Sequence, residues 1–215
     1  MKTIITTVLL AGALAFSATA HAITIGITPS TTTLAVGDTF SADVIVSDLG
    51  NFVPPSLGVF DLNIAFTQTT FGFTGVNFGS FLGDLGLGEA TSSVDDSTTP
   101  GVINLFELSF LEADGATCLL CIPPYLDDIQ PASFVLATLA FDVIGAGVSA
   151  LTLSVNSLGD GFGDPLDFVV EDGSPIIVRS NNPIPEPATV PLLAFGIALL
   201  GLGRVQKTVY LLLCG

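Results

Sequence analysis

Apolar and polar side chains alternate along the middle of the chain. The alternation runs through residues 40–47, 60–67, 138–143 and 151–156. A period of two places one face of a β-strand in a core and the other face in water. Two more uniformly apolar segments are typical of strands covered on both faces, namely Val102–Phe110 and Ser133–Leu139. The pattern therefore predicts a series of short strands.

Clusters of Gly, Pro and Asp separate these strands. They lie at residues 34–38, 53–55, 83–84, 95–96 and 159–161. No eleven-residue window between the two ends of the chain carries a convincing helical stripe of apolar residues. Many short strands with frequent turns favour an all-β fold, either a β-sandwich or a jelly roll.

Phenylalanine alternates with glycine and threonine between residues 70 and 81. The spacing predicts a pair of strands there. We expect the aromatic rings of this segment to fill the core, namely Phe71, Phe73, Phe78 and Phe81.

The first 22 residues have the composition of a secretory signal peptide. Lys2 is their only charged residue, the segment Ile4–Phe16 is mostly apolar, and Ala20–Ala22 supplies small residues for cleavage after Ala22. An uncleaved N-terminal anchor helix is the alternative. Export would place the mature protein in an oxidising compartment.

An uncharged apolar segment also lies near the C-terminus. It runs from Ala188 to Gly203 and is followed by the basic residues Arg204 and Lys207. A helix needs about twenty apolar residues to span a membrane without tilting or local thinning. The segment predicts a short transmembrane helix whose basic end stays in the cytoplasm.

The remaining residues, 23–182, are strongly acidic. They contain nineteen Asp and Glu side chains and a single base, Arg179. Nucleic acids and anionic membrane surfaces are poor partners for such a chain, because both need Lys and Arg. The segment contains no histidine, so a Ser-His-Asp or Cys-His pair has no base.

Acidic side chains in one Gly-rich segment form a candidate calcium site. Ca²⁺ prefers hard oxygen ligands on a flexible turn. A solvated acidic loop, with Asp and Gly serving turn geometry, is the alternative. The pairs Asp95–Asp96 and Asp127–Asp128 are weaker candidates. The predicted ligands are Asn156, Asp160, Asp164, Asp167, Glu171 and Asp172.

Cys118 and Cys121 are separated by two residues, ahead of Pro123–Pro124. A redox-active CxxC needs a thioredoxin-like βαβ setting, which the strand pattern does not provide. In an oxidising compartment the pair predicts a local disulfide, with two free thiols as the alternative.

The sequence offers little evidence for a catalytic site or for aromatic side chains that stack on sugars. Paired carboxylates could hydrolyse glycosides, and Glu107 and Glu112 are among many acids, but no pair stands out. The chain has no Trp, and Tyr125 is the only Tyr before the tail. We therefore expect no enzymatic activity.

Three segments together resemble a cohesin domain. The sequence VGDTF at residues 36–40 leads into an alternating strand, and residues 57–66 resemble the next strand of that family. LATLAF at 136–141 followed by GVSALTL at 147–153 resembles its late strand pair. The resemblance implies a nine-stranded jelly-roll sandwich over residues 23–180, a scaffold shared with several carbohydrate-binding modules.

The C-terminal segment resembles the PEP-CTERM sorting tail of bacterial envelope proteins. Pro185, Glu186 and Pro187 precede the apolar segment and its basic end. The resemblance implies that an exosortase-type membrane protease recognises this triplet and removes the helix. A plain C-terminal anchor is the alternative. The predicted parts are a signal peptide (1–22), a sandwich (23–180), a linker (181–187) and a transmembrane tail (188–215).

Together these features predict a secreted, non-catalytic structural or interaction protein. Its expected destination is the cell surface or an exopolysaccharide matrix, after an intermediate held in the inner membrane. The alternative is a module that binds carbohydrate or, as cohesins do, a protein partner. Calcium is the only cofactor suggested, and nucleic acid is excluded as a partner.

Overall fold

The computed structural model describes residues 22–116 and 120–180. The predicted signal peptide up to residue 21, Cys118, the linker and the tail lie outside the described residues. No helix in the described part is both long enough and apolar enough to cross a membrane.

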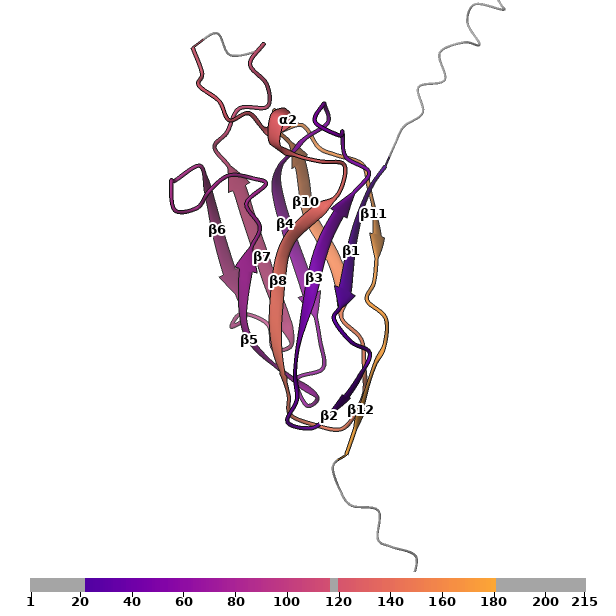
Figure 1. The fold of residues 1–215 in the computed structure, drawn as a ribbon. Helices are drawn as coiled ribbons and strands as arrows, with labels where there is room; N and C mark the ends of the chain where they lie inside the picture. Colours follow the sequence, from indigo (N-terminus) through magenta and orange to yellow (C-terminus); the bar gives the residue numbers. More distant parts are fainter. Residues whose placement is uncertain (1–21, 117–119, 181–215) are drawn as a thin grey trace, which may run out of the picture. The chain divides into compact units, whose positions relative to one another are not determined.

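Two β-sheets form the body of the molecule (Figure 1). The first has five strands, in the order β11 (Phe168–Glu171), β1 (Ile23–Pro29), β3 (Thr39–Ser47), β8 (Phe134–Val143) and β5 (Phe71–Phe78). The second has four strands, in the order β10 (Thr152–Asp160), β4 (Leu57–Ala65), β7 (Val102–Ser109) and β6 (Ala90–Asp95). The predicted all-β sandwich is confirmed.

A third, small sheet joins β2 (Thr33–Ala35), β12 (Ile176–Arg179) and β9 (Gly147–Ser149). It lies at the lower end of the sandwich in Figure 1. Two pairings are parallel, β1 with β11 and β2 with β12, and the other pairings are antiparallel. The helix α2 (Leu126–Ile129) is a single turn.

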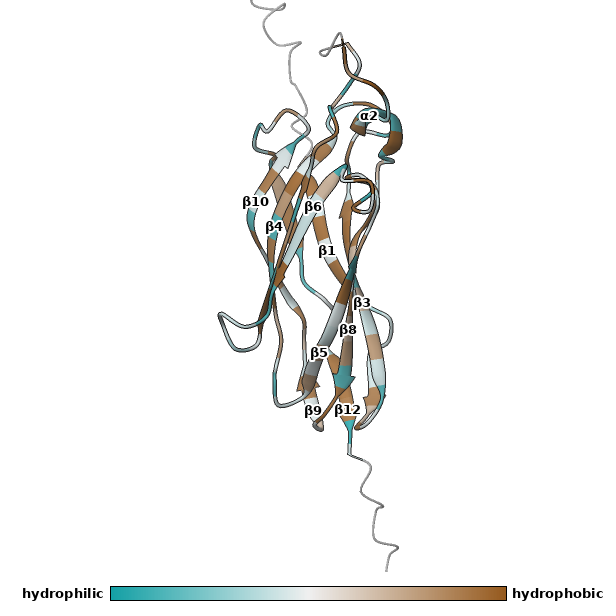
Figure 2. Ribbon diagram, turned by 90° about the vertical axis from the view of Figure 1, so that its left-hand side faces the viewer, coloured by the Kyte–Doolittle hydropathy of each residue, from teal (hydrophilic) through white to brown (hydrophobic). Residues whose placement is uncertain are grey.

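The core follows the period-two pattern of the sequence. In β3, Phe40, Ala42, Val44 and Val46 are buried, while the residues between them lie nearer the surface. Figure 2 shows this alternation as bands of apolar and polar residues along the strands. Phe141 on β8 stacks on Phe40, with ring centroids 5.2 Å apart.

The prediction for Val102–Phe110 was wrong about burial on both faces. In β7 only one face is buried, with Ile103, Leu105 and Glu107, and Phe110 beyond the strand is exposed. The reason is that no described segment covers the outer face of the four-stranded sheet.

The prediction of a strand pair between residues 70 and 81 was also wrong. The segment forms one strand, β5, because it pairs along its length with β8 across a register shift between Phe73 and Gly75. The expected core role holds: Phe71 is buried, and Phe73, Phe78 and Phe81 pack partly buried against the core.

Four connections meet at one end of the sandwich, which we call the α2 end. They comprise the described residues of 48–56, 79–89, 110–116, 120–133 and 161–167, of which 110–116 and 120–133 belong to one connection, and they lie at the top of Figure 1. Buried Gln130 joins its own connection to the start of β4 and to the connection after β5. Its side-chain amide donates to the carbonyls of Leu57 (2.8 Å) and Phe81 (2.9 Å), and its oxygen accepts from the Leu57 amide (2.7 Å).

Candidate functional site

A cluster of hydrogen-bonded polar side chains lies on the outer face of the four-stranded sheet. We call it the amide cluster: Asp61 and Asn63 of β4, Asn104 of β7 and Asn156 of β10. Asn104 donates to Oδ1 of Asp61 at 2.6 Å and to Asn63 at 3.0 Å. Asn156 donates to the same Asp61 oxygen at 2.9 Å and accepts from Asn63 at 3.0 Å.

Strand register brings these four residues together. Asn63 lies opposite Asn104 on β7 and opposite Ser154 on β10. A register shift between Val155 and Ser157 then leaves Asn156 unpaired in the ladder and turned toward Asp61. Bulges of this kind re-aim a side chain relative to the regular alternation.

The surface around the amide cluster mixes apolar and small polar groups. Half-buried apolar side chains face outward from β4 and β7, namely Val59, Ala65, Val102, Phe106 and Leu108. The edge strands add Thr and Ser, namely Thr91, Ser93, Thr152 and Ser154. Few charges, an apolar centre and fixed polar groups are typical of a protein-docking surface.

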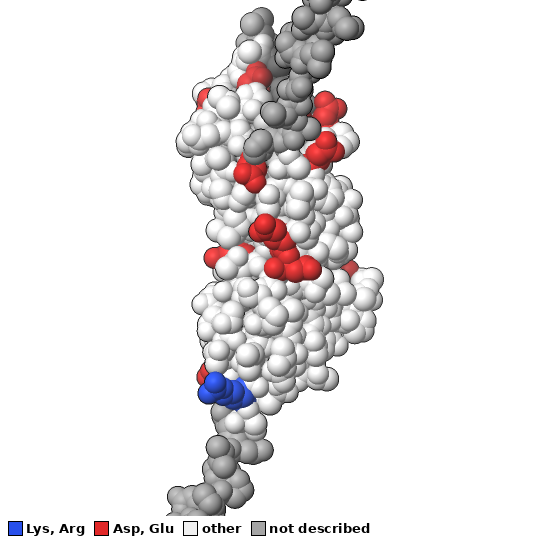
Figure 3. Space-filling view, turned by 90° about the vertical axis from the view of Figure 1, so that its right-hand side faces the viewer, with Lys and Arg blue, Asp and Glu red and all other residues white. Residues whose placement is uncertain are grey.

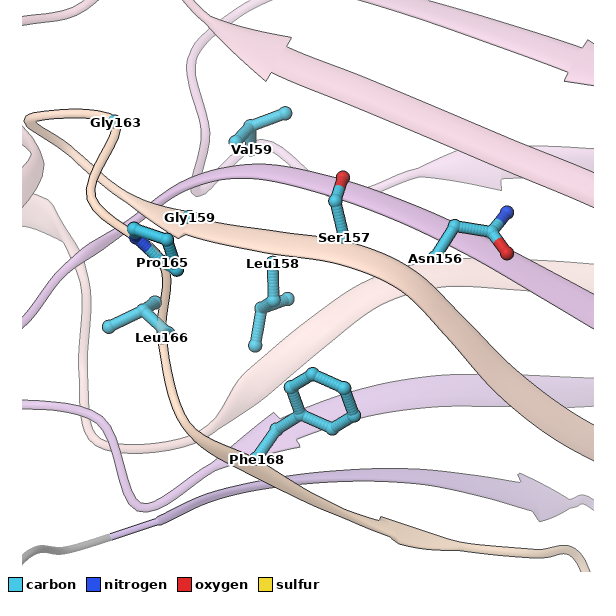
Figure 4. A pocket seen from close by; sticks show the side chains of 9 residues that line it. All are labelled: Val59, Asn156, Ser157, Leu158, Gly159, Gly163, Pro165, Leu166 and Phe168. Carbon is cyan, nitrogen blue, oxygen red and sulfur yellow. The ribbon is translucent and has the colours of Figure 1, made fainter.

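A pocket of about 320 Å³ opens beside this face (Figure 4). The loop after β10 shapes it, because Oδ1 of Asp160 accepts from the amides of Phe162 and Asp164, both at 2.9 Å, and Gly163 takes a positive φ of 86°. None of the lining side chains titrates, so the pocket suits an apolar group of a partner. Its lining is Val59, Asn156, Ser157, Leu158, Gly159, Gly163, Pro165, Leu166 and Phe168.

The structure distributes the predicted calcium ligands over different roles. Asn156 belongs to the amide cluster, Asp160 holds its own turn, and Asp172 accepts from the Leu153 amide at 2.9 Å. Glu171 lies opposite Gly26 at the end of the β1–β11 pairing. Between residues 22 and 180, leaving aside 117–119, no three acidic, His or Cys side chains are grouped to hold a metal. Calcium binding stays a prediction for the full set of proposed ligands, which also includes Asp164 and Asp167.

The two weaker acidic pairs also have structural explanations. Asp95 accepts from the hydroxyl and amide groups of Thr98 and Ser97, led by the Thr98 hydroxyl, and these bonds hold its pKa well below the usual range. Asp127 is buried, which raises its pKa above the ordinary value, and its Oδ1 has no hydrogen-bond partner among the described residues.

Glu107 lies in the core rather than at the surface. It is 1% exposed, neither carboxyl oxygen has a hydrogen-bond partner among the described residues, and burial raises its pKa to about 8. Glu112 is exposed in the connection after β7, so the two acids do not form a surface pair. The alternation Ile103, Leu105, Glu107 already placed this acid on the buried face, a signal that the sequence reasoning missed.

Cys121 is disulfide-bonded. Cys118 lies outside the described residues, so the predicted partner stays a prediction. The same holds for the sorting residues Pro185, Glu186 and Pro187 and for the basic residues Arg204 and Lys207.

The C-terminal segment matches a family profile. Residues 183–207 match the profile described as the PEP-CTERM protein-sorting motif. The chain carries a PEP-CTERM sorting motif. No curated protein matches the chain.

Solved structures similar to the sandwich are cohesin modules. A Clostridium acetobutylicum cohesin, solved with its dockerin, has a TM-score of 0.53 and 21% identity, covering 73% of this chain and 99% of that one. A Clostridium thermocellum cohesin in a type I cohesin–dockerin complex gives 0.55 and 12%, covering 74% and 95%. A non-cellulosomal cohesin of Archaeoglobus fulgidus gives 0.51 and 13%, covering 75% and 94%. The sandwich that precedes the sorting motif therefore has a cohesin-like fold.

Proposed function

We propose that this chain is a non-catalytic docking module that is exported and sorted to the cell envelope. The observation that carries the proposal is the sorting motif at residues 183–207, which follows a cohesin-like sandwich. The C-terminal motif directs sorting to the envelope, and the sandwich provides a rigid surface for a partner. The absence of histidine between residues 23 and 182 fits a role without acid–base turnover.

The outer face of the four-stranded sheet is the proposed docking surface. Its amides are already fixed by one another, so little side-chain freedom is lost when a partner binds. The side-chain amides of Asn104 and Asn156 both donate to Oδ1 of Asp61. Oδ2 accepts from neither amide and can accept a hydrogen bond from the partner. Related cohesins in the solved complexes bind dockerins. We propose a protein partner of this general kind.

The finer steps of sorting belong to the same proposal. An exosortase-type protease recognises Pro185, Glu186 and Pro187. Removal of the apolar tail then releases the sandwich to the surface or to an exopolysaccharide matrix. Before cleavage, Arg204 and Lys207 hold the basic end of the tail on the cytoplasmic side.

The sorting step is tested by measuring the intact mass and the location of the protein in its own host. We expect a mature chain that begins at Ile23 and lacks the residues after the Pro-Glu-Pro triplet. A Glu186→Ala variant is expected to keep its tail and stay in the membrane. A wild-type protein that retains residue 215 in the inner membrane would contradict sorting and would indicate a plain anchor.

The docking step is tested with a double variant, Asn63→Ala with Asn156→Ala. Loss of the fixed amides is expected to weaken partner binding about tenfold or more, since each hydrogen bond to a partner contributes about 1 kcal/mol. The partner is first captured from the host envelope fraction and its affinity is then measured with purified proteins. Asn77→Ala, on an exposed position of β5 in the other sheet, is the matched control. Equal loss in both variants, or binding only to exopolysaccharide, would contradict a protein-docking face.

A further inference from the structure

Large apolar side chains project into solvent at the α2 end of the sandwich. Phe52 is 53% exposed and Val53 is 56% exposed in the connection between β3 and β4. Leu87, between β5 and β6, is 75% exposed, and Ile122, before α2, is 85% exposed. We call these four residues the apolar tip. They belong to three connections that the topology brings to one end (Figure 1).

Phe52 adopts a left-handed backbone conformation, which is sterically unfavourable for a bulky side chain. Its φ is +59°, in the left-handed region that glycine and asparagine favour and bulky residues rarely adopt. The Phe52 amide donates to the Gln130 carbonyl at 2.9 Å, and the Ala132 amide donates to the Asn51 side chain at 3.4 Å. These bonds hold an exposed aromatic ring at a strained position. Strain of this kind concentrates at binding sites.

Charge at this end restricts what the apolar tip can contact. Exposed carboxylates lie in the same connections, namely Asp48, Asp84, Glu112 and Asp128. The only Lys or Arg of the described residues is Arg179, at the end of β12, on the small sheet at the opposite end. Figure 3 shows one basic group at the lower end of the face it draws and acidic groups above it.

This charge pattern disfavours two occupants of the apolar tip. A second copy would bring a second set of carboxylates against the first, and like charges in contact oppose association. An anionic lipid surface is repelled for the same reason. A partner segment with basic side chains beside an apolar face is attracted by both the charge and the apolar area.

We propose that the apolar tip is a second docking surface, which binds a protein segment whose apolar face is flanked by Lys and Arg. It lies apart from the amide cluster, which is on the outer face of a sheet. The chain leaves the sandwich at Ser180, at the opposite end from the apolar tip. The point at which the chain leaves the sandwich is therefore away from this surface. The binding itself does not depend on the tail.

The proposal is tested with the full-length secreted protein and a synthetic amphipathic helical peptide of leucine and lysine. The tip variant carries Phe52→Asn and Val53→Thr. Asparagine tolerates the left-handed backbone, and threonine keeps the shape of valine, so the fold is preserved. The control carries Val148→Thr and Ile177→Thr, two similarly exposed positions of the small sheet at the other end. Cooperative thermal unfolding of all three proteins, with neither variant melting below the wild type by more than a few degrees, verifies folding.

We expect the wild type and the control to bind the peptide equally, and the tip variant to bind at least tenfold more weakly. We also expect binding to weaken as salt rises, because the exposed carboxylates are screened. Equal affinity of the tip variant and the control, or no binding by the wild type, overturns the proposal. If the wild type is retained on phosphatidylcholine vesicles and the tip variant is not, the apolar tip binds lipid and the proposal is overturned. A dimer in sedimentation velocity that the tip variant loses assigns the tip to self-association and overturns it as well.

Discussion

Replacing Glu107 with methionine is expected to stabilise the protein by about 2–3 kcal/mol at pH 7. The carboxyl group is buried on β7 between the two sheets, without a hydrogen-bond partner among the described residues. Burial raises its pKa from 4.5 to about 8, so the folded state holds a proton that the unfolded chain releases at pH 7. Each pH unit above 4.5 costs about 1.4 kcal/mol of stability through this group. Methionine has a similar length and carries no charge to desolvate.

The sign of this effect predicts a distinct pH profile. Because the pKa of Glu107 is raised in the folded state, its contribution to the free energy of unfolding is fully present below pH 4.5. That contribution is lost progressively between pH 4.5 and about 8. The melting temperature of the wild type is therefore expected to fall over this range by more than that of the variant. Other carboxylates add their own dependence, so the difference between the two proteins is the quantity to compare.

Urea unfolding of wild type, Glu107→Met and Glu107→Gln at pH 5 and pH 8 provides the measurement. Glutamine removes the titration but leaves a buried amide, so it should flatten the profile and gain less stability than methionine. Glu112→Gln, at an exposed position, is the control and should leave the profile unchanged. Parallel profiles for the wild type and the Glu107 variants would show that Glu107 ionises normally in the folded state.

Gln130→Leu is expected to destabilise the protein by about 3–5 kcal/mol. Gln130 is 1% exposed and makes three hydrogen bonds, two to the backbone of Leu57 and one to the carbonyl of Phe81. Leucine fills the space but leaves buried backbone groups without partners, which costs about 1–3 kcal/mol each. The connections at the α2 end would also lose the side chain that joins them.

Chemical denaturation compares this variant with Gln68→Leu, which changes an exposed residue of the connection between β4 and β5. The control is expected to change stability by less than about 0.5 kcal/mol. Hydrogen exchange should also show faster exchange of the Leu57 amide in Gln130→Leu. A loss in stability no larger than that of the control would mean that water replaces the three bonds.

The sequence alone predicted the main strands, because their alternation is a local property. Residues 40–47 lie in β3 and residues 60–65 lie in β4, with the expected faces buried, while Phe66 and Thr67 follow the end of β4. The cohesin-like order of segments also anticipated two sheets with nine strands in all. The error at β7 arose because the outer environment of a strand decides its burial, which its own residues do not encode. The error at β5 arose because pairing with β8 across a register shift decides how many strands the segment forms.

The candidate docking face could not have been predicted from sequence spacing. Asn104 lies 43 residues after Asp61 in the sequence and Asn156 lies 95 residues after it, yet both side chains donate hydrogen bonds to Asp61. They meet only because β7 and β10 flank β4 and because a register shift re-aims Asn156. The sequence grouped Asn156 with the acids that follow it, and only the sheet revealed its actual neighbours.

The sequence by itself determined the class of fold and the sorting motif, since strand periodicity and a continuous tail motif are both read within short windows. The tertiary structure decided which polar residues meet, that the buried carboxyl of Glu107 has no hydrogen-bond partner among the described residues, and that several exposed apolar side chains lie at the α2 end. These depend on strand order and register, which bring distant segments together. The contacts that such pairing creates leave no signal within a short window of the sequence, although the local alternation Ile103, Leu105, Glu107 does place Glu107 on the buried face.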